Sequence, residues 1–74
     1  MRVLVKKIKD EHTLGLCFPD GTIHIDPRQR KLDFLDTAIH EALHRACPKM
    51  KERKVRKIAP VIAKVLWRLK YRRN

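Results

Sequence analysis

Hydrophobic and polar residues alternate with a period of about two in the first third of the chain, which is typical of β-strands. Three such segments occur, at residues 3–8, 13–18 and 22–26. Pro19-Asp20-Gly21 separates the second and third segments and predicts a tight turn, because proline fixes φ and glycine tolerates positive φ. Since the connections are short, we expect residues 1–26 to form an antiparallel meander of three strands.

The pattern changes to a helical period after Pro27. Asp33 is a good N-cap for a first helix over residues 33–47, and Pro48 disfavours helical geometry beyond Cys47. At 100° per residue, five apolar residues of this helix fall on one face. They are Leu35, Ile39, Ala42, Leu43 and Ala46.

A second helix is predicted over residues 51–71, where apolar residues follow i, i+3, i+4 spacing without interruption. These residues are Val55, Ile58, Ala59, Ile62, Val65, Leu66 and Leu69. Because only a few residues separate the helices, they should pack as an antiparallel hairpin. The chain therefore predicts one α+β domain over residues 1–74, in which a small antiparallel sheet of about three short strands precedes two helices.

Composition limits the class of protein. A chain of 74 residues buries a modest core and is only marginally stable alone. Its hydrophobic fraction of 43% and charged fraction of 36% are typical of a globular domain. No apolar run approaches the roughly twenty residues that span a bilayer, and charge interrupts the N-terminal segment too early for a signal peptide. Two cysteines thirty positions apart fit reduced thiols, so we expect a cytoplasmic protein without a membrane partner.

The net charge of +11 is concentrated in the last third of the chain. Residues 1–48 carry eight Lys and Arg against seven Asp and Glu, whereas residues 49–74 carry eleven against Glu52 alone. Such an imbalance predicts non-specific binding of DNA or RNA through phosphate contacts, although a solvated charged helix is the ordinary alternative. Four cations that line the outer face of the second helix are the expected contacts: Arg53, Lys57, Lys64 and Arg68.

The first helix carries the pentad His40-Glu41-Ala42-Leu43-His44, an H-E-x-x-H motif. Two histidines at i and i+4 project from one side of a helix about one turn apart, as two zinc ligands require. They face away from the apolar stripe of their own helix, so they are not core histidines. A polar helix face without a metal is the alternative, because so short a motif also occurs by chance.

Glu41 is offset around the helix from His40 and His44. It can therefore reach a water at the metal rather than the metal itself. In this chemistry zinc lowers the pKa of a water to about 7 and polarises the scissile carbonyl, and the glutamate takes the proton. The motif thus predicts Glu41 as the general base of a zinc peptidase.

A zinc site needs a third protein ligand. Glu52 is the only acid after the pentad, and it belongs to the first turn of the second helix, close to the loop that follows His44. An acid at this place also stabilises a helix N-terminus. Cys47 is the rival ligand, because it shares a face with the histidines if the helix continues through it. The ligand patterns of catalytic zinc sites favour Glu52.

Residues 25–48 and 52–72 resemble small H-E-x-x-H zincin-like proteins encoded by bacteriophages and short SprT-like metallopeptidases, and the similarity covers about residues 22–73. The pentad is the specific part of this resemblance. The resemblance implies a minimal zincin-like fold, peptidase chemistry and a host cytoplasm. It also implies His40, His44 and Glu52 as zinc ligands and Glu41 as base. The gap between His44 and Glu52 is shorter than in larger zincins of this type.

The leading hypothesis is a zinc-dependent metallopeptidase that hydrolyses a peptide or protein substrate. We expect the substrate to add as an extended strand beside residues 22–26. The alternative is a non-enzymatic nucleic-acid-binding protein in which any zinc is structural. The two hypotheses differ in their need for Glu41, because only the enzyme requires it.

Overall fold

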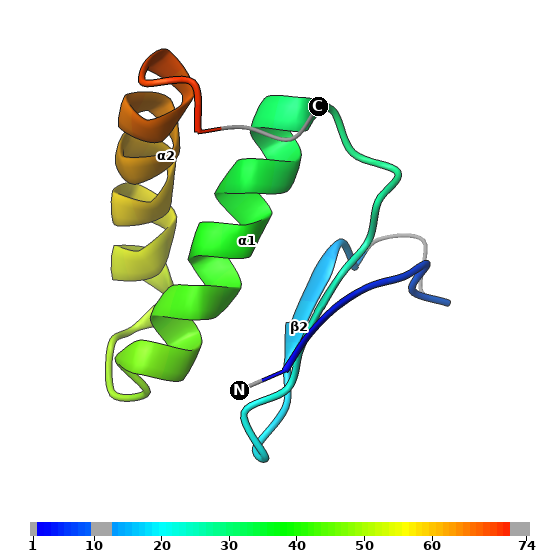
Figure 1. Ribbon diagram of the computed structural model, residues 1–74. Coiled ribbons are helices and arrows are strands. Elements are labelled where there is room, and N and C mark those ends of the chain that lie inside the picture. Colours follow the sequence, from blue (N-terminus) through cyan, green and yellow to red (C-terminus); the bar gives the residue numbers. More distant parts are fainter. Residues whose placement is uncertain (1, 10–12, 72–74) are drawn as a thin grey trace.

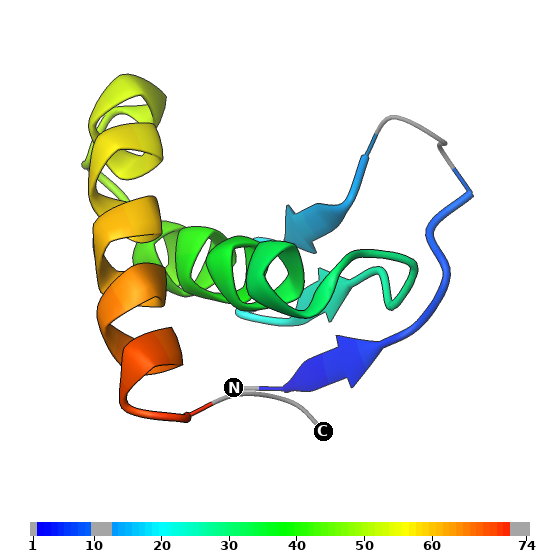
Figure 2. The same cartoon turned by 90° about the horizontal axis from the view of Figure 1, so that it is seen from above.

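The structure is a computed structural model that describes residues 2–9 and 13–71. It contains three strands, β1 (Val3–Val5), β2 (Gly15–Cys17) and β3 (Ile23–Ile25), followed by two helices, α1 (Lys31–Ala46) and α2 (Glu52–Arg68). The expected α+β class, a three-stranded sheet followed by a helix hairpin, is confirmed. Helix α1 lies between the sheet and α2 (Figure 1), and the axes of the two helices cross (Figure 2).

The sheet is mixed, with the order β1-β3-β2, and is therefore not the expected antiparallel meander. Strand β3 is central; it pairs parallel with β1 and antiparallel with β2. The expectation of a meander required short connections, and only the turn between β2 and β3 is short. The longer segment between β1 and β2 allows the chain to cross to the other edge of the sheet.

The turn predicted at Pro19-Asp20-Gly21 is confirmed. Gly21 has a φ of +89°, and its N–H donates to the carbonyl of Phe18 over 2.9 Å. The Asp20 carboxylate accepts a bond of 2.8 Å from the N–H of Thr22. These bonds hold β2 and β3 side by side.

Both helices differ slightly from their predicted bounds. Helix α1 begins at Lys31, so Asp33 lies in the first turn, where an acid also interacts favourably with the helix dipole. Helix α2 ends at Arg68 because Lys70 adopts a φ of +66°. The N–H groups of Lys70 and Tyr71 then bond the carbonyls of Trp67 and Leu66, which closes the helix in a Schellman motif.

The buried face of each helix is narrower than the apolar stripe in the sequence. Helix α2 buries Val55, Ala59 and Ala63, three residues spaced by four, whereas Val65 and Leu69 are exposed. In α1, Ala42 and Ala46 are exposed, and the most buried residue is Glu41. The small side chains of Ala59 and Ala63 let α2 approach α1 closely. The larger apolar residues beside them, Val65 and Leu69, remain exposed to solvent.

Asp26 connects the end of β3 to the end of β1 and to the loop before α1. Its carboxylate, which is fully buried, accepts bonds from the N–H of Ile8 (2.9 Å) and from the guanidinium of Arg28 (2.8 and 2.6 Å). The Arg28 hydrogen bonds outweigh the effect of burial and hold the pKa of Asp26 well below its usual range. The side chain of Gln29 continues this network to Thr37 of α1.

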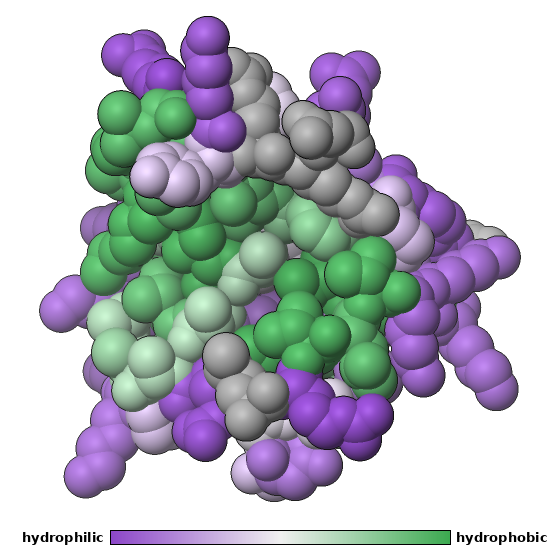
Figure 3. Space-filling model, in the orientation of Figure 1, coloured by the Kyte–Doolittle hydropathy of each residue, from purple (hydrophilic) through white to green (hydrophobic). Residues whose placement is uncertain are grey.

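Helix α1 contacts β2 and β3, and β1 extends beyond it. Val3 and Val5 of β1 are consequently about half exposed. Figure 3 shows apolar side chains gathered over α2 and over this strand, with charged side chains around them. Val3 and Val5 of β1 and Val61 and Val65 of α2 are thus apolar residues exposed at the surface.

We expect Asp26→Asn to lower the thermal midpoint of unfolding at neutral pH, because an amide donates where Ile8 and Arg28 already donate. The folded-state pKa of Asp26 is depressed, so its stabilising effect is complete above the unfolded pKa of about 3.9 and is lost as pH falls below it. The difference in midpoint between wild type and variant should therefore be constant above about pH 5 and shrink toward pH 2. A difference that does not change with pH would contradict the role of the ionised carboxylate.

Candidate metal centre

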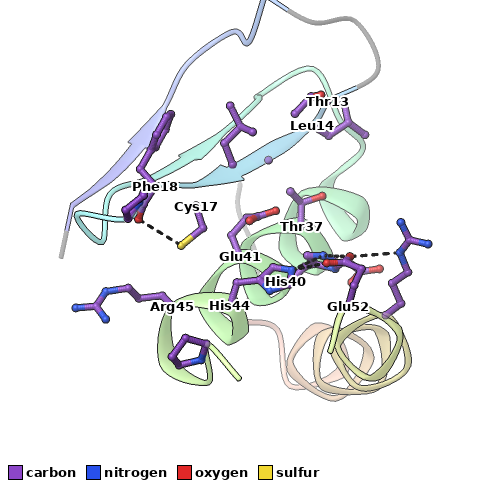
Figure 4. Close-up of a pocket in the computed structure, with 16 residues that line it drawn as sticks. Thr13, Leu14, Cys17, Phe18, Thr37, His40, Glu41, His44, Arg45 and Glu52 are labelled. Carbon is purple, nitrogen blue, oxygen red and sulfur yellow. Dashed lines mark hydrogen bonds and ion pairs between the residues drawn. The ribbon is translucent and has the colours of Figure 1, made fainter. Parts of the chain in front are cut away.

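Three predicted ligands lie together at the end of the structure where the two helices are joined. The Nε2 atoms of His40 and His44 are 3.2 Å apart, and the two carboxylate oxygens of Glu52 lie 2.7 Å from one nitrogen each. Within the described residues this is the cluster of His, Cys, Asp and Glu side chains whose ligand atoms converge. The close-up in Figure 4 shows both imidazoles turned toward the Glu52 carboxylate.

The donor set and its spacing fit a zinc ion. Two nitrogens bound to one tetrahedral zinc at about 2.0–2.1 Å are separated by about 3.3 Å, close to the separation found between these Nε2 atoms. The oxygen–nitrogen contacts are shorter than this value, so Glu52 would withdraw slightly to admit an ion. Glu52 can make this movement because its side chain is 47% exposed at the start of α2.

The contacts of Glu52 with the two imidazoles depend on where the hydrogens of the imidazoles lie. Both Nε2 atoms can donate to Glu52 only when both carry a hydrogen, and a metal ion between the three side chains replaces these hydrogens. Burial alone would raise the pKa of Glu52, but the nearby imidazoles of His40 and His44 and the guanidinium of Arg56 lower it overall. The carboxylate is therefore ionised at neutral pH, as a zinc ligand must be.

Arg56 is an outer partner of the cluster that the sequence patterns did not single out. It lies four residues after Glu52, and its Nε is 3.3 Å from the Oε1 atom of that ligand. Hydrogen-bonded partners of this kind orient metal ligands. The i, i+4 spacing of Glu52 and Arg56 on one helix is the sequence pattern that could have indicated this ion pair.

Glu41 lies on the neighbouring side of α1, between the cluster and strand β2. The residue is only 8% exposed. Burial raises the pKa of its carboxyl, the imidazoles of His40 and His44 oppose this rise, and Glu52 adds to it. A raised pKa makes the carboxylate a stronger base than one in water.

Gly15 permits this position of Glu41. A Cβ at Gly15 would lie 2.6 Å from Cγ2 of Thr37 and 2.9 Å from Oε2 of Glu41, closer than nonbonded atoms allow. The absence of a side chain thus brings β2 against α1 and places the carboxylate beside the strand. An isolated glycine in a strand pattern signals such a close approach, and residues 13–18 contain this signal.

A groove runs between β2 and α1 and contains the cluster. Its walls are formed by residues 13–19 on one side, and by Asp36, Thr37, His40, Glu41 and His44 on the other, with Glu52 and Arg56 at one end. Figure 4 shows Glu41, Cys17 and Thr37 between the strand and the helix. The groove therefore brings a backbone edge, a buried carboxylate and the convergent ligands to one surface.

The other predicted residues lie outside the cluster. Cys47 caps the C-terminus of α1 and is not among the convergent ligand atoms of the described chain. The four cations predicted to contact nucleic acid are exposed on α2 and do not line the groove. They are Arg53, Lys57, Lys64 and Arg68.

Comparisons with protein-family models, with curated protein sequences and with solved structures gave no match. No helix among the described residues is long and apolar enough to cross a membrane.

We expect Gly15→Ala to destabilise the protein by about 1–3 kcal/mol, the usual cost of inserting a methyl group into a tight contact. Unfolding in urea measures this change. Thr37→Ser removes the Cγ2 atom nearest the new Cβ and keeps the hydroxyl that donates to Gln29. The double variant should therefore lose less stability than the two single changes together. Additive losses would contradict a direct collision between these residues.

We expect one zinc ion per chain, measured by titration calorimetry and metal analysis after dialysis. Loss of a residue that only hydrogen-bonds a metal ligand weakens metal binding by about 10–100-fold. His44→Ala removes a ligand itself, so it should weaken zinc binding by more than this. Zinc at 100 times its dissociation constant should stabilise the wild type by about 2.7 kcal/mol and leave His44→Ala unchanged.

Cys47→Ser is the matched control for the zinc measurement, because Cys47 follows His44 closely but lies outside the cluster. It should keep the affinity of the wild type. Zinc loss in Cys47→Ser with retention in Glu52→Gln would assign the third ligand to the cysteine instead.

Proposed function

We propose that the protein is a zinc-dependent peptidase. The observation that carries the proposal is the position of Glu41, a nearly buried carboxylate that lines the same groove as the convergent His40, His44 and Glu52 side chains. A site that only bound metal would have no use for a buried acid beside its ligands. Burying an acid costs stability, so its presence there supports a use beyond metal binding.

Zinc held by His40, His44 and Glu52 would supply Lewis acidity, which lowers the pKa of a water and polarises a carbonyl. The chain supplies the remaining functions. Arg56 orients the Glu52 carboxylate, and the short distance between the two imidazoles fixes where the ion would lie. The two helices bring these ligands together across the loop 47–51.

Glu41 supplies the proton acceptor. Its carboxylate is raised in pKa by burial and remains accessible from the groove, so it can take a proton from a water and return it to the leaving amine. After it accepts the proton, Glu41 would be a neutral carboxylic acid. Its poorly solvated position favours this neutral form. Burial of Glu41 thus supports its use as a base.

A peptide is the substrate class that the groove favours, because strand β2 forms one of its walls. Phe18 donates its N–H to the carbonyl of Thr22, the carbonyl of Leu14 accepts from the N–H of Asp26, and Leu16 pairs with His24 of β3. Main-chain groups alternate along a strand, so Gly15 and Cys17 direct theirs toward the opposite edge, where no described strand pairs with β2. An extended peptide can add there by main-chain hydrogen bonds.

The expected place for the substrate, beside residues 22–26, is wrong. Strand β3 has β1 on one side and β2 on the other, so both of its edges are occupied. The substrate strand is therefore assigned to the free edge of β2, on the same side of the sheet as α1.

A structural zinc site is the second candidate, and the placement of the ligands favours it. His40 and His44 belong to α1 and Glu52 to α2, so an ion would tie the two helices together in a chain with few buried apolar residues. This candidate needs the three ligands but not Glu41. The resemblance to phage zincin-like proteins remains a prediction that agrees with either candidate.

We expect Glu41→Gln to keep the zinc affinity and to lower the cleavage rate of an unfolded protein substrate by about 10²–10⁴-fold, the usual contribution of a positioned general base. The amide retains the shape of the side chain and cannot accept the proton. Cleavage of a fluorescent unfolded protein by zinc-loaded wild type and variant measures the ratio.

Asp33→Asn is the matched control for the cleavage measurement, because it makes the same acid-to-amide change on an exposed residue of α1 outside the groove. It should cleave at the wild-type rate. A chelator should stop both proteins, since cleavage that persists with chelator comes from a contaminant. Absence of cleavage by zinc-loaded wild type would favour the structural zinc site.

A further inference from the structure

A basic surface surrounds the turn between the two helices, and its residues do not line the groove. Met50 lies in a hollow of about 700 Å³ that is lined by five cations of the turn and the first two turns of α2. We call this surface the basic corner. Its cations are Lys49, Lys51, Arg53, Lys54 and Lys57, all of them exposed.

No acid of the described residues pairs with a cation of the basic corner. Glu52 is the only acid after residue 48, and its carboxylate is already shared by His40, His44 and Arg56. None of the ion pairs found in the described ranges 2–9 and 13–71 includes a cation of the corner. Five like charges in one place are unfavourable by themselves, so an anionic partner would stabilise them.

The start of α2 adds to this field. Its N-cap residue, Lys51, makes no side-chain capping bond, so the first amide groups of a helix of 17 residues point toward the corner without a capping side chain. The positive end of the helix dipole lies at the same place. Backbone and side chains therefore favour the same kind of ligand, one with several negatively charged oxygens.

The cations also extend along α2 beyond the corner. Arg53, Lys57, Lys64 and Arg68 fall on one outward stripe at the helical repeat. At 1.5 Å per residue, the stripe from Arg53 to Arg68 is about 22 Å long. A partner that matches it must carry negative charge repeated over a similar length, which a single phosphate group or a short acidic peptide does not.

We propose that the basic corner and this stripe form a docking surface for the phosphate backbone of nucleic acid, independent of base sequence. A duplex carries one phosphate per 3.4 Å of each strand, so about six base pairs would cover the stripe. The corner exposes only Met50 and the stems of long cations between its charges, with no aromatic side chain to stack on a base. Binding would thus be electrostatic and sensitive to salt.

An anionic membrane is the competing partner, because α2 also exposes Val61, Val65 and Leu69. A helix that lies in a membrane interface needs its apolar face in the bilayer and its cations at the rim of that face. The five cations of the corner instead surround a single half-buried methionine. Nucleic acid is therefore favoured, and vesicles of anionic lipid serve as a test of the alternative.

The consequence for the groove follows from the position of two consecutive residues. Glu52 belongs to the metal cluster and lines the groove, whereas Arg53 belongs to the basic corner. Nucleic acid on the corner would hold the groove beside the phosphate backbone. Proteins that are themselves bound to nucleic acid would then be presented to the groove at high local concentration.

The test compares two triple variants that lose the same net charge. Lys49, Lys54 and Lys57 are each replaced by Gln in one protein, and the exposed Lys6, Lys7 and Lys9 near β1 are each replaced by Gln in the other. Binding of a fluorescent duplex DNA of arbitrary sequence is measured by anisotropy at several salt concentrations. Zinc content and thermal midpoint are measured for both proteins, and neither set of lysines belongs to the metal cluster.

The wild type should bind the duplex with an affinity that falls steeply with salt. The corner variant should bind at least tenfold more weakly, and the slope of log affinity against log salt should decrease by about 2–3, because each lost phosphate contact removes about 0.9. The control variant should change the slope by less than about 1. An equal loss in both variants would show that net charge rather than the corner is responsible and would overturn the proposal.

Two further outcomes would also overturn the proposal. One is a wild type that does not bind the duplex at about 50 mM salt, where electrostatic binding is strong. The other is binding to phosphatidylserine vesicles that depends on the same three lysines while the duplex is not bound. Neither outcome depends on peptidase activity, so these measurements test nucleic-acid binding independently of the function of the groove.

Discussion

The carboxylate of Glu52, shared between the imidazoles of His40 and His44, is the polar interaction that joins α1 to α2. The buried apolar core is small: it consists of isoleucines under α1 and of Val55 and two alanines of α2. Such a core specifies the approach of two helices only loosely. The contacts of Glu52 with His40 and His44 add a polar link between the helices and place the three side chains where a metal ion would need them.

The same side of α1 carries a second constraint, the contact between β2 and Glu41. Gly15 lets the strand approach the helix, and this approach buries a carboxylate that would otherwise be solvated. The network around Asp26 holds the sheet in position, since it ties the end of β1 and the loop before α1 to the end of β3. Placement of the strand next to the cluster forms the groove between β2 and α1.

Much of this arrangement could be predicted from local patterns. Helical spacing placed His40 and His44 on one side of α1, and Pro48 together with the second apolar repeat brought Glu52 back to them across a short loop. The order of the strands could not be predicted, because the crossing of β1 to the far side of β3 depends on non-local pairing. Burial of Glu41 was also missed, since a helical wheel shows which residues share a face but not what packs against that face.

Zinc-edge X-ray absorption of the zinc-loaded protein tests the central claim most directly, because it reports the atoms bound to the ion whether or not the protein is active. We expect nitrogen and oxygen neighbours at about 2.0–2.2 Å with an imidazole signature from two histidines, and the loss of one oxygen neighbour in Glu52→Gln. A sulfur neighbour at about 2.3 Å would assign Cys47 or Cys17 to the ion and contradict a centre formed by His40, His44 and Glu52.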